Sequence, residues 1–258
     1  MKPTADSTTR FTDRVTDYVR YRPGYPDALA EALHGEVGFG PSSTVADIGS
    51  GTGISSELLL RLGCEVFAVE PNAAMRQAAE TRFAGNAKFH SLDATAEATT
   101  LASGSVDGIA AGKAFHWFDA AQARTEFGRI LTNGGVVALF WNNRRTDTSE
   151  FLRDYERLLH QFGTDYREVD HRNVGPARLR EFFRADFQTR TFRNEQIFDF
   201  AGLRGRLLSS SYAPSPTHPN CGPMLEALQR LFDEHQVQGQ VRFEYDTELF
   251  FGPLRSDG

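Results

Sequence analysis

The segment Val45-Ala46-Asp47-Ile48-Gly49-Ser50-Gly51-Thr52-Gly53 decides the fold of this chain. A short apolar run, typical of a buried strand, passes directly into three glycines at alternate positions. Because glycine lacks a Cβ atom, a ligand can lie against the backbone there and a helix can begin at once. A dinucleotide fingerprint requires glycine at position 54, where this chain has Ile54. The segment therefore predicts a strand, a ligand-binding turn and a helix, but not an NAD-binding turn.

Two carboxylates belong to this predicted site. Asp47 stands two residues before Gly49, where it would repel a pyrophosphate and would suit a cationic or hydrogen-bond-donating group. Glu70 ends the next apolar run, and its two oxygens can accept hydrogen bonds from both hydroxyls of a ribose. Together they favour a positively charged adenosine derivative as the ligand.

Strand-like and helix-like segments alternate on both sides of the turn. The expected strands of the first half are 44–48, 65–69, 87–90, 106–110 and 136–141, and the expected helices are 54–62, 73–83 and 120–131. A turn is expected at Asn133-Gly134-Gly135. The second half predicts helices at 150–162, 200–208 and 224–235, strands at 187–198 and 241–251, and an apolar cluster at 179–183. Such alternation predicts a parallel sheet with ligands at the carboxyl ends of its strands.

Composition narrows the classes of function. Lys and Arg number 28 against 34 Asp and Glu, and the formal net charge of −6 argues against nucleic acid as a partner. No run of eighteen apolar residues and no secretory leader is visible, so we expect no membrane association and a cytoplasmic location. Cys64 and Cys221 lack the spacing of a metal site, so we expect reduced thiols and no metal.

Several motifs together resemble those of class I S-adenosylmethionine-dependent methyltransferases. They are Asp47 to Gly53, Val69-Glu70-Pro71-Asn72 with Met75, Asp93-Ala94, and Ala114-Phe115-His116-Trp117-Phe118. The resemblance covers most of residues 15–145. Two further segments, Tyr21-Arg22-Pro23-Gly24-Tyr25-Pro26 and Phe115-His116-Trp117-Phe118-Asp119, are similar to a small-molecule subgroup that includes trans-aconitate methyltransferase-like proteins.

This resemblance implies a fold and a division of the chain. The implied fold is α/β, a Rossmann-like, doubly wound, mostly parallel seven-stranded sheet with an antiparallel C-terminal strand and a helical cap. We expect a single domain, in which residues 1–26 form an N-terminal arm over the cofactor and residues 27–145 form the cofactor-binding core. Residues 146–258 are expected to supply the cap helices and C-terminal strands.

The resemblance also implies S-adenosyl-L-methionine as the cofactor. Glu70 would bind the ribose, Asn72 and Met75 would lie beside the adenine, and Asp93 would receive the adenine amino group. Met75 could instead pack in the core, and Asp93 could cap the segment that begins at Thr95. The expected cofactor-binding residues are Arg22, Asp47, Gly49, Ser50, Gly51, Gly53, Glu70, Pro71, Asn72, Met75, Asp93, Ala94, Gly112 and Ala114.

The loop after the expected fourth strand is implied to face the methyl acceptor. Lys113 stands where relatives commonly carry glutamine, and it could meet an anionic substrate. His116 is the candidate catalytic residue, as a general base, although it could equally be a packing residue. The expected substrate-pocket residues are Tyr21, Lys113, Trp117 and Trp141, and Arg144 and Arg145 are further cationic anchors for a carboxylate acceptor.

The predicted function is methyl transfer to a small-molecule acceptor by in-line displacement at the sulfonium methyl. One alternative is a protein that binds S-adenosylmethionine or S-adenosylhomocysteine without transferring a methyl group. A second alternative, an NAD-dependent oxidoreductase, would share the fold type but lacks its third glycine at Ile54. The acceptor and the oligomeric state are left open at this point.

Overall fold

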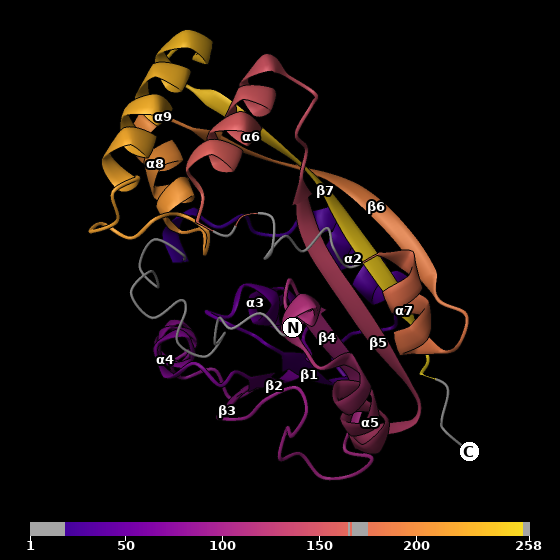
Figure 1. Cartoon of the computed structure of the whole chain (residues 1–258). Coiled ribbons are helices and arrows are strands. Elements are labelled where there is room, and N and C mark those ends of the chain that lie inside the picture. The colour runs from indigo at the N-terminus through magenta and orange to yellow at the C-terminus, as the bar shows by residue number, and fades with distance from the viewer. Residues whose placement is uncertain (1–18, 165, 167–174, 255–258) are drawn as a thin grey trace.

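A seven-stranded sheet forms the centre of the computed structural model, which describes residues 19–164, 166 and 175–254 (Figure 1). The strand order is β3-β2-β1-β4-β5-β7-β6. The strands are β1 (Thr44–Ile48), β2 (Glu65–Val69), β3 (Phe89–Leu92), β4 (Val106–Gly112), β5 (Leu131–Arg144), β6 (Gln188–Phe198) and β7 (Val241–Gly252). Neighbours from β3 to β5 pair in parallel, whereas β7 is antiparallel to both β5 and β6. The mostly parallel sheet with an antiparallel C-terminal strand is thereby confirmed.

Helices cover both faces of this sheet. Successive strand residues point to opposite faces, and each face has apolar side chains to bury. On one face Val45 and Ala110 pack with α2 (Asp27–Gly35) and α3 (Ile54–Arg61). On the other face Ala46 and Ile109 pack with α5 (Ala120–Ile130) and α7 (Pro176–Phe183). Helix α4 (Ala73–Arg82) follows β2 and is capped by the side chain of Asn72, which accepts a hydrogen bond from the Met75 N–H. Both faces are therefore buried, as a parallel sheet requires.

Two strands begin two or more residues away from the expected position. Strand β3 begins at Phe89 rather than at residue 87, because the Asn86 side chain and carbonyl accept hydrogen bonds from the N–H groups of Lys88 and Phe89 and form a turn there. Strand β5 begins at Leu131, and the turn expected at residues 133–135 lies within it. Leu131 pairs with Val106 and Val136 pairs with Gly108, so the residues between them form an irregularity in the strand.

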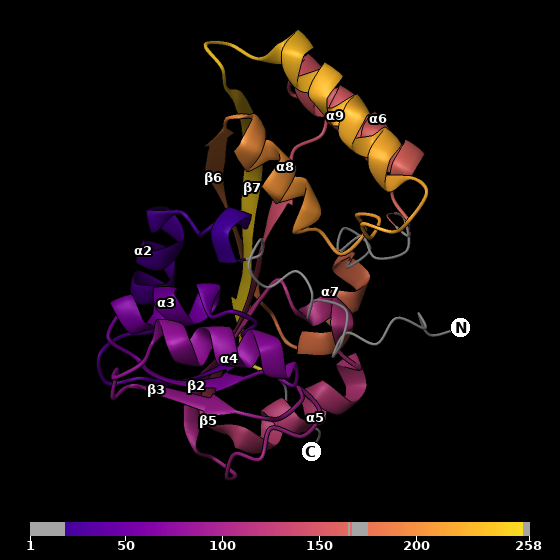
Figure 2. The ribbon, with the colours of Figure 1, turned by 90° about the vertical axis from the view of Figure 1, so that its left-hand side faces the viewer.

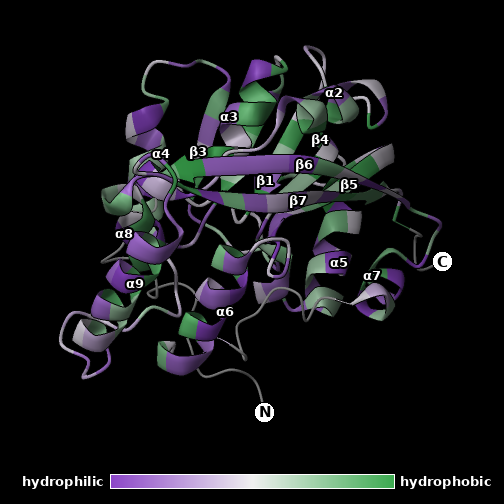
Figure 3. Cartoon of the chain, turned by 90° about the horizontal axis from the view of Figure 1, so that it is seen from above, coloured by the Kyte–Doolittle hydropathy of each residue, from purple (hydrophilic) through white to green (hydrophobic). Residues whose placement is uncertain are grey.

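Strands β5, β6 and β7 extend beyond the others and carry the helical cap. Helices α6 (Glu150–Phe162), α8 (Phe200–Leu208) and α9 (Cys221–His235) gather at that far end, well away from α3 and α4 (Figures 1 and 2). Their apolar residues form a separate core with the ends of β6 and β7. Helices α6 and α9 show hydrophobic patches between hydrophilic ones in Figure 3, as expected for helices that bury one side. The expected helical cap is confirmed.

Backbone carbonyls of the segment before α2 accept hydrogen bonds from side chains of the C-terminal half. The Gly24 carbonyl accepts hydrogen bonds from the side-chain amides of Asn142 on β5 (3.1 Å) and Asn194 on β6 (2.9 Å). The Tyr21 carbonyl accepts one from Gln196 (3.2 Å). Residues 1–18 of the expected arm lie outside the described residues. Within the described part, the segment before α2 thus joins the sheet to the cap side of the molecule.

Candidate active site

The glycine turn after β1 depends on backbone conformations that favour glycine. Gly49, Gly51 and Gly53 all have positive φ angles, of 68°, 58° and 85°. A Cβ atom on Gly49 would lie 2.5 Å from Cβ of Ala114, and one on Gly53 would lie 2.4 Å from Phe83. The turn is therefore packed directly against the loop that follows β4, and it leaves its own backbone facing the pocket.

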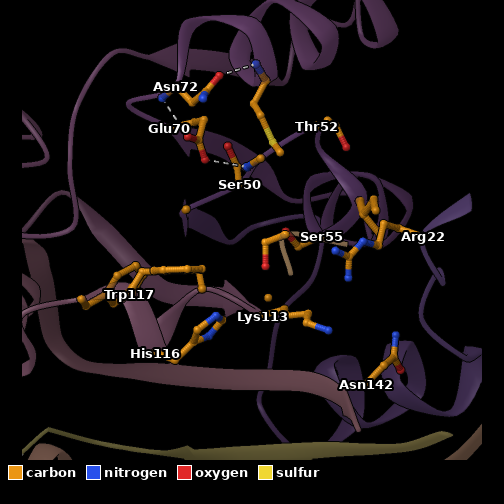
Figure 4. A pocket seen from close by; sticks show the side chains of 18 of the residues that line it. Arg22, Ser50, Thr52, Ser55, Glu70, Asn72, Lys113, His116, Trp117 and Asn142 are labelled. Carbon is orange, nitrogen blue, oxygen red and sulfur yellow. Dashed lines mark hydrogen bonds between the residues drawn. The ribbon is translucent and has the colours of Figure 1, made fainter. Parts of the chain in front are cut away.

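Glu70 lies beside this turn with both oxygens held in place. One carboxylate oxygen accepts a hydrogen bond from the Gly51 N–H (2.9 Å), and the other accepts one from the Asn72 N–H (2.8 Å), as Figure 4 shows. Burial raises the pKa of the carboxyl, and these two N–H groups oppose that rise. Each oxygen has a second lone pair, so the fixed carboxylate can accept two further donors from a ligand.

Asp47 occupies a different position from the one expected. Its carboxylate is fully buried and accepts hydrogen bonds from the hydroxyls of Ser55 (2.8 and 2.9 Å) and Ser56 (2.6 Å). Burial raises its pKa to about 6, although the two serine hydroxyls oppose this. The side chain thus fastens the first turn of α3 to the end of β1, beneath the pocket, whereas Ser55 lines the pocket itself.

A pocket opens at the carboxyl ends of β1, β2, β4 and β5, where a parallel sheet binds its ligands. Most of the expected residues line it. From the cofactor set these are Arg22, Gly49, Ser50, Gly51, Glu70, Pro71, Asn72, Met75, Gly112 and Ala114, and from the acceptor set Lys113, His116 and Trp117. Figure 4 shows Glu70 and Asn72 on one side of the pocket, with His116, Lys113 and Asn142 on the other.

The sequence around this pocket matches a known protein family. Residues 46–139, which contain the glycine turn and Glu70, match the family described as "Methyltransferase domain". Residues 46–139 of this chain form a methyltransferase domain. The resemblance of its motifs to that family is confirmed.

Curated relatives of this chain are identical to it at about a third of the aligned residues. An uncharacterized methyltransferase of Mycobacterium bovis is 33% identical over 163 residues, which cover 63% of this chain and 64% of that protein. An uncharacterized methyltransferase of Schizosaccharomyces pombe is 32% identical over 138 residues, which cover 52% of this chain and 53% of that protein. The chain thus spans between about half and two thirds of the length of these relatives.

A solved structure shares the fold over nearly the whole chain. It is a candidate type II methyltransferase from Anaeromyxobacter dehalogenans, 24% identical, with a TM-score of 0.64. The superposition covers 91% of this chain and 98% of that one. The long β5–β7 strands and the cap are thus included with the methyltransferase domain in the shared architecture.

Six expected residues do not line the pocket of the methyltransferase domain. Two of them, Asp47 and Gly53, support the glycine turn from outside the pocket. A third, Asp93, pairs through both oxygens with the Arg76 guanidinium (3.0 and 3.1 Å) and is 70% exposed. Ala94, next to it, is buried in the sheet core. Tyr21 packs against Gly205 of α8. Within the described residues Asp93 therefore takes part in a surface ion pair, and the adjacent Thr95 to Glu97 line the pocket instead.

Trp141 lies outside the pocket because of the pleat of β5. Its indole is buried in the core of the opposite face and stacks on Phe250 at 5.2 Å between ring centroids. Its neighbour Asn142 and then Arg144, two residues further on, line the pocket. Arg145 again points elsewhere and lies 3.6 Å from the Asp246 carboxylate. Alternate residues of one strand therefore divide between core and site.

His116 is half-buried in the short 3₁₀ turn η2 (Phe115–Trp117) after β4. Burial, together with the nearby charges of Lys113, Arg178 and Arg22, lowers the pKa of its imidazole to about 3. The ring is therefore neutral at neutral pH and is a weak proton acceptor. Its predicted use as a general base remains a prediction, and the lowered pKa favours a hydrogen-bonding or packing role.

The cap supplies site residues that no sequence motif indicated. Arg206 on α8, Tyr245 on β7 and the loop residues Ser211 and Tyr212 line the same pocket as the glycine turn. They lie more than 100 residues downstream of that turn, in segments whose only sequence signal was an apolar period. Two further kinds of feature are absent among the described residues. No helix there is long and apolar enough to cross a bilayer. No group of three or more His, Cys, Asp or Glu side chains there could hold a metal ion.

Proposed function

We propose that this protein transfers a methyl group from S-adenosyl-L-methionine to a small-molecule acceptor. Glu70 carries the proposal, because a buried carboxylate with both oxygens oriented by backbone N–H groups beside a glycine turn suits the two hydroxyls of a ribose. A second observation supports the fit. The hydroxyl of Thr52 lines the same pocket, is buried, and has no hydrogen-bond partner among the described residues.

Different residues of the pocket would bind different parts of this cofactor. Glu70 would bind the ribose, Asn72 and Met75 would lie beside the adenine, and the backbone of Gly49 and Gly51 would contact the remaining part of the cofactor. Arg22 is expected to bind the carboxylate of the methionine part. Its guanidinium lines the pocket and donates a hydrogen bond to the Ser209 carbonyl (2.9 Å), which holds it in place.

When bound, this cofactor supplies a methyl group on a positively charged sulfur that is a good leaving group. The protein's task is therefore to align the acceptor with that methyl group and to exclude water. The loop of Gly112 to Ala114 and the 3₁₀ turn with His116 and Trp117 would form one wall around the acceptor. His116 would accept or donate a hydrogen bond as a neutral imidazole, and an acceptor that must lose a proton would release it to bulk solvent outside the closed site.

The test begins with cofactor binding. Calorimetric titration with S-adenosylhomocysteine should show binding, and NAD should not compete. Glu70→Gln should weaken S-adenosylhomocysteine binding by about tenfold or more, because an amide replaces one acceptor oxygen with a donor and loses the charge. An exposed acid on the cap, Asp233→Asn, serves as the control and should leave the affinity unchanged.

Activity is then measured with methyl-labelled cofactor across small acids, phenols and amines. Transfer of label to any acceptor in this panel supports the proposal. Tight binding of S-adenosylhomocysteine with no transfer to any acceptor would indicate a binding protein instead. Binding of NAD alone would refute the proposed cofactor.

A further inference from the structure

We propose that the methyl acceptor carries an oxyanion group, a carboxylate or a phosphate, which Arg144 and Arg206 bind at the cap side of the pocket. This inference rests on the proposed function, because it names the class of acceptor for the same pocket. It concerns the half of the pocket that the cap contributes, where the described lining residues are mainly arginine, tyrosine and serine.

Arg144 has a donor group that the protein leaves unused. One terminal nitrogen, Nη2, donates to the Tyr166 hydroxyl (3.1 Å) and pairs with the Glu156 carboxylate. The other, Nη1, is buried and has no hydrogen-bond partner among the described residues. The guanidinium lies over the Tyr155 ring, 4.9 Å from its centroid, and its side chain is only 9% exposed. A buried cationic donor without an acceptor is costly, and an anionic ligand in the pocket would relieve that cost.

Arg206 lies in the same part of the pocket without a carboxylate partner. It is 3% exposed, and its Nε and Nη1 groups donate to the hydroxyls of Tyr245 (3.3 Å) and Ser210 (3.0 Å). Both of these acceptors are neutral, and in the described part of the chain no acidic side chain forms an ion pair with Arg206. Among the described residues, the side-chain acceptors of its guanidinium are thus a phenol and a serine hydroxyl. Buried charges of this kind are normally paired, so a ligand anion is the expected partner.

The two guanidinium groups both affect the pKa of the same tyrosine in the pocket, Tyr212. Burial alone would raise the pKa of the Tyr212 phenol, yet Arg206, Arg144 and Arg22 together lower it. Tyr212 lines the pocket and packs edge-on against Tyr166, 4.8 Å between centroids. Because Arg144 also donates to the Tyr166 hydroxyl, and Arg206 lines the same pocket, both positive charges lie beside the part of the cavity that these tyrosines line.

The overall charge of the pocket also favours an anion. Four cationic side chains line its described part, and the acids there are Glu70 and Glu97. Both acids belong to the cofactor side, where Glu70 holds the glycine turn and Glu97 accepts a hydrogen bond from the Asp119 N–H (2.9 Å). A bound sulfonium cofactor would add a further positive charge. Two planar guanidinium forks suit the paired oxygens of a carboxylate or phosphate.

The experiment measures anion binding by calorimetry in a low-chloride buffer, with and without saturating S-adenosylhomocysteine. The probes are succinate, inorganic phosphate and the neutral analogue succinamide. The variants are Arg144→Gln and Arg206→Gln, with Arg145→Gln as the matched control, because Arg145 directly follows the end of β5 and pairs with Asp246 outside the pocket. The unchanged affinity of each variant for S-adenosylhomocysteine reports that it is folded.

The wild-type protein should bind succinate or phosphate and should not bind succinamide. Each pocket variant should weaken anion binding by about tenfold or more, as expected for the loss of a charged hydrogen bond, whereas Arg145→Gln should change it less than twofold. The stronger of the two anions identifies the group as a carboxylate or a phosphate. Equal affinity in Arg144→Gln, Arg206→Gln and wild type, or equal binding of succinamide, would overturn the proposal.

The two proposals can fail separately. If the wild-type protein does not bind S-adenosylhomocysteine, the proposed function fails, and the measurement without it still decides whether the two arginines bind an anion. If S-adenosylhomocysteine binds normally and no anion does, the acceptor class is wrong and the proposed function stands.

Discussion

Replacing Asp47 by asparagine should stabilise the protein at neutral pH and leave it almost unchanged in acid. The carboxylate is fully buried, and its hydrogen-bond donors are two serine hydroxyls rather than a cation. Its pKa is about 6 in the folded protein against 3.8 ordinarily. Asparagine has nearly the same shape and resembles the protonated acid, with one oxygen to accept from Ser56 and an amide to donate to Ser55.

The sign of the effect follows from where the proton is released. Below about pH 4 both the folded and the unfolded chain hold it, so ionisation has no effect on stability. Between pH 3.8 and about 6 the unfolded chain releases the proton while the folded chain keeps it, so stability falls as the pH rises. Above pH 6 the full penalty of about 3 kcal/mol is present. The asparagine variant lacks this penalty.

Urea unfolding at a series of pH values between 4.5 and 7.5 would measure the difference. Over this range the free energy of unfolding of Asp47→Asn minus that of wild type should grow by about 2 kcal/mol. Comparison at equal pH removes the contributions of other titrating groups. Asp233→Asn, at an exposed position, should show no comparable growth. A difference for Asp47→Asn that stays constant with pH, or shrinks as the pH rises, would refute the reasoning.

Four further outcomes are expected. Gly49→Ala should abolish S-adenosylhomocysteine binding and lower the melting temperature, because the added methyl group would lie 2.5 Å from Ala114 at a φ of 68°; an unchanged melting curve would contradict this. Arg22→Ala should weaken S-adenosylhomocysteine binding about tenfold while Tyr25→Phe changes it little, and equal dissociation constants by calorimetry would reject the role of Arg22. Because the His116 pKa is about 3, the pH profile of kcat should show no titration assignable to this group between pH 5 and 8, and the profile of His116→Gln should keep its shape. Stability that depends on neutral His116 should be complete above pH 6.5 and should be lost as the pH falls, which acid unfolding of the same variant can check.

The strands and helices around the glycine turn were predictable because their signals are local. Strands β1 and β2 and helices α6 and α8 have the expected bounds, since apolar period and end signals act within a few residues. The start of β3 was misplaced because a hydrogen-bonded turn at Asn86 precedes it. The irregularity in β5 was interpreted as a turn, since a glycine pair indicates a change of direction in both cases.

The two halves of the candidate site differ in how far the sequence could indicate them. The glycine turn and Glu70 were predictable because a strand end, its turn and the next strand end meet at one edge of a parallel sheet. Trp141 was not correctly placed, because both faces of β5 are covered and its apolar residues do not show which face meets the acceptor. The pleat then assigned Asn142 and Arg144 to the pocket instead.

The sequence by itself determined the order of strands and helices along the chain and the glycine turn with Glu70 on one side of the pocket. Only the tertiary structure decided which residues lie across that pocket from the glycine turn. Arg144 on β5 and Arg206 on α8 are 62 residues apart in the chain and line the same pocket because the long β5–β7 strands carry the cap helices beside it. An arginine on an isolated helix is usually solvated, and its burial without a carboxylate partner depends on packing between distant segments, which no local pattern records.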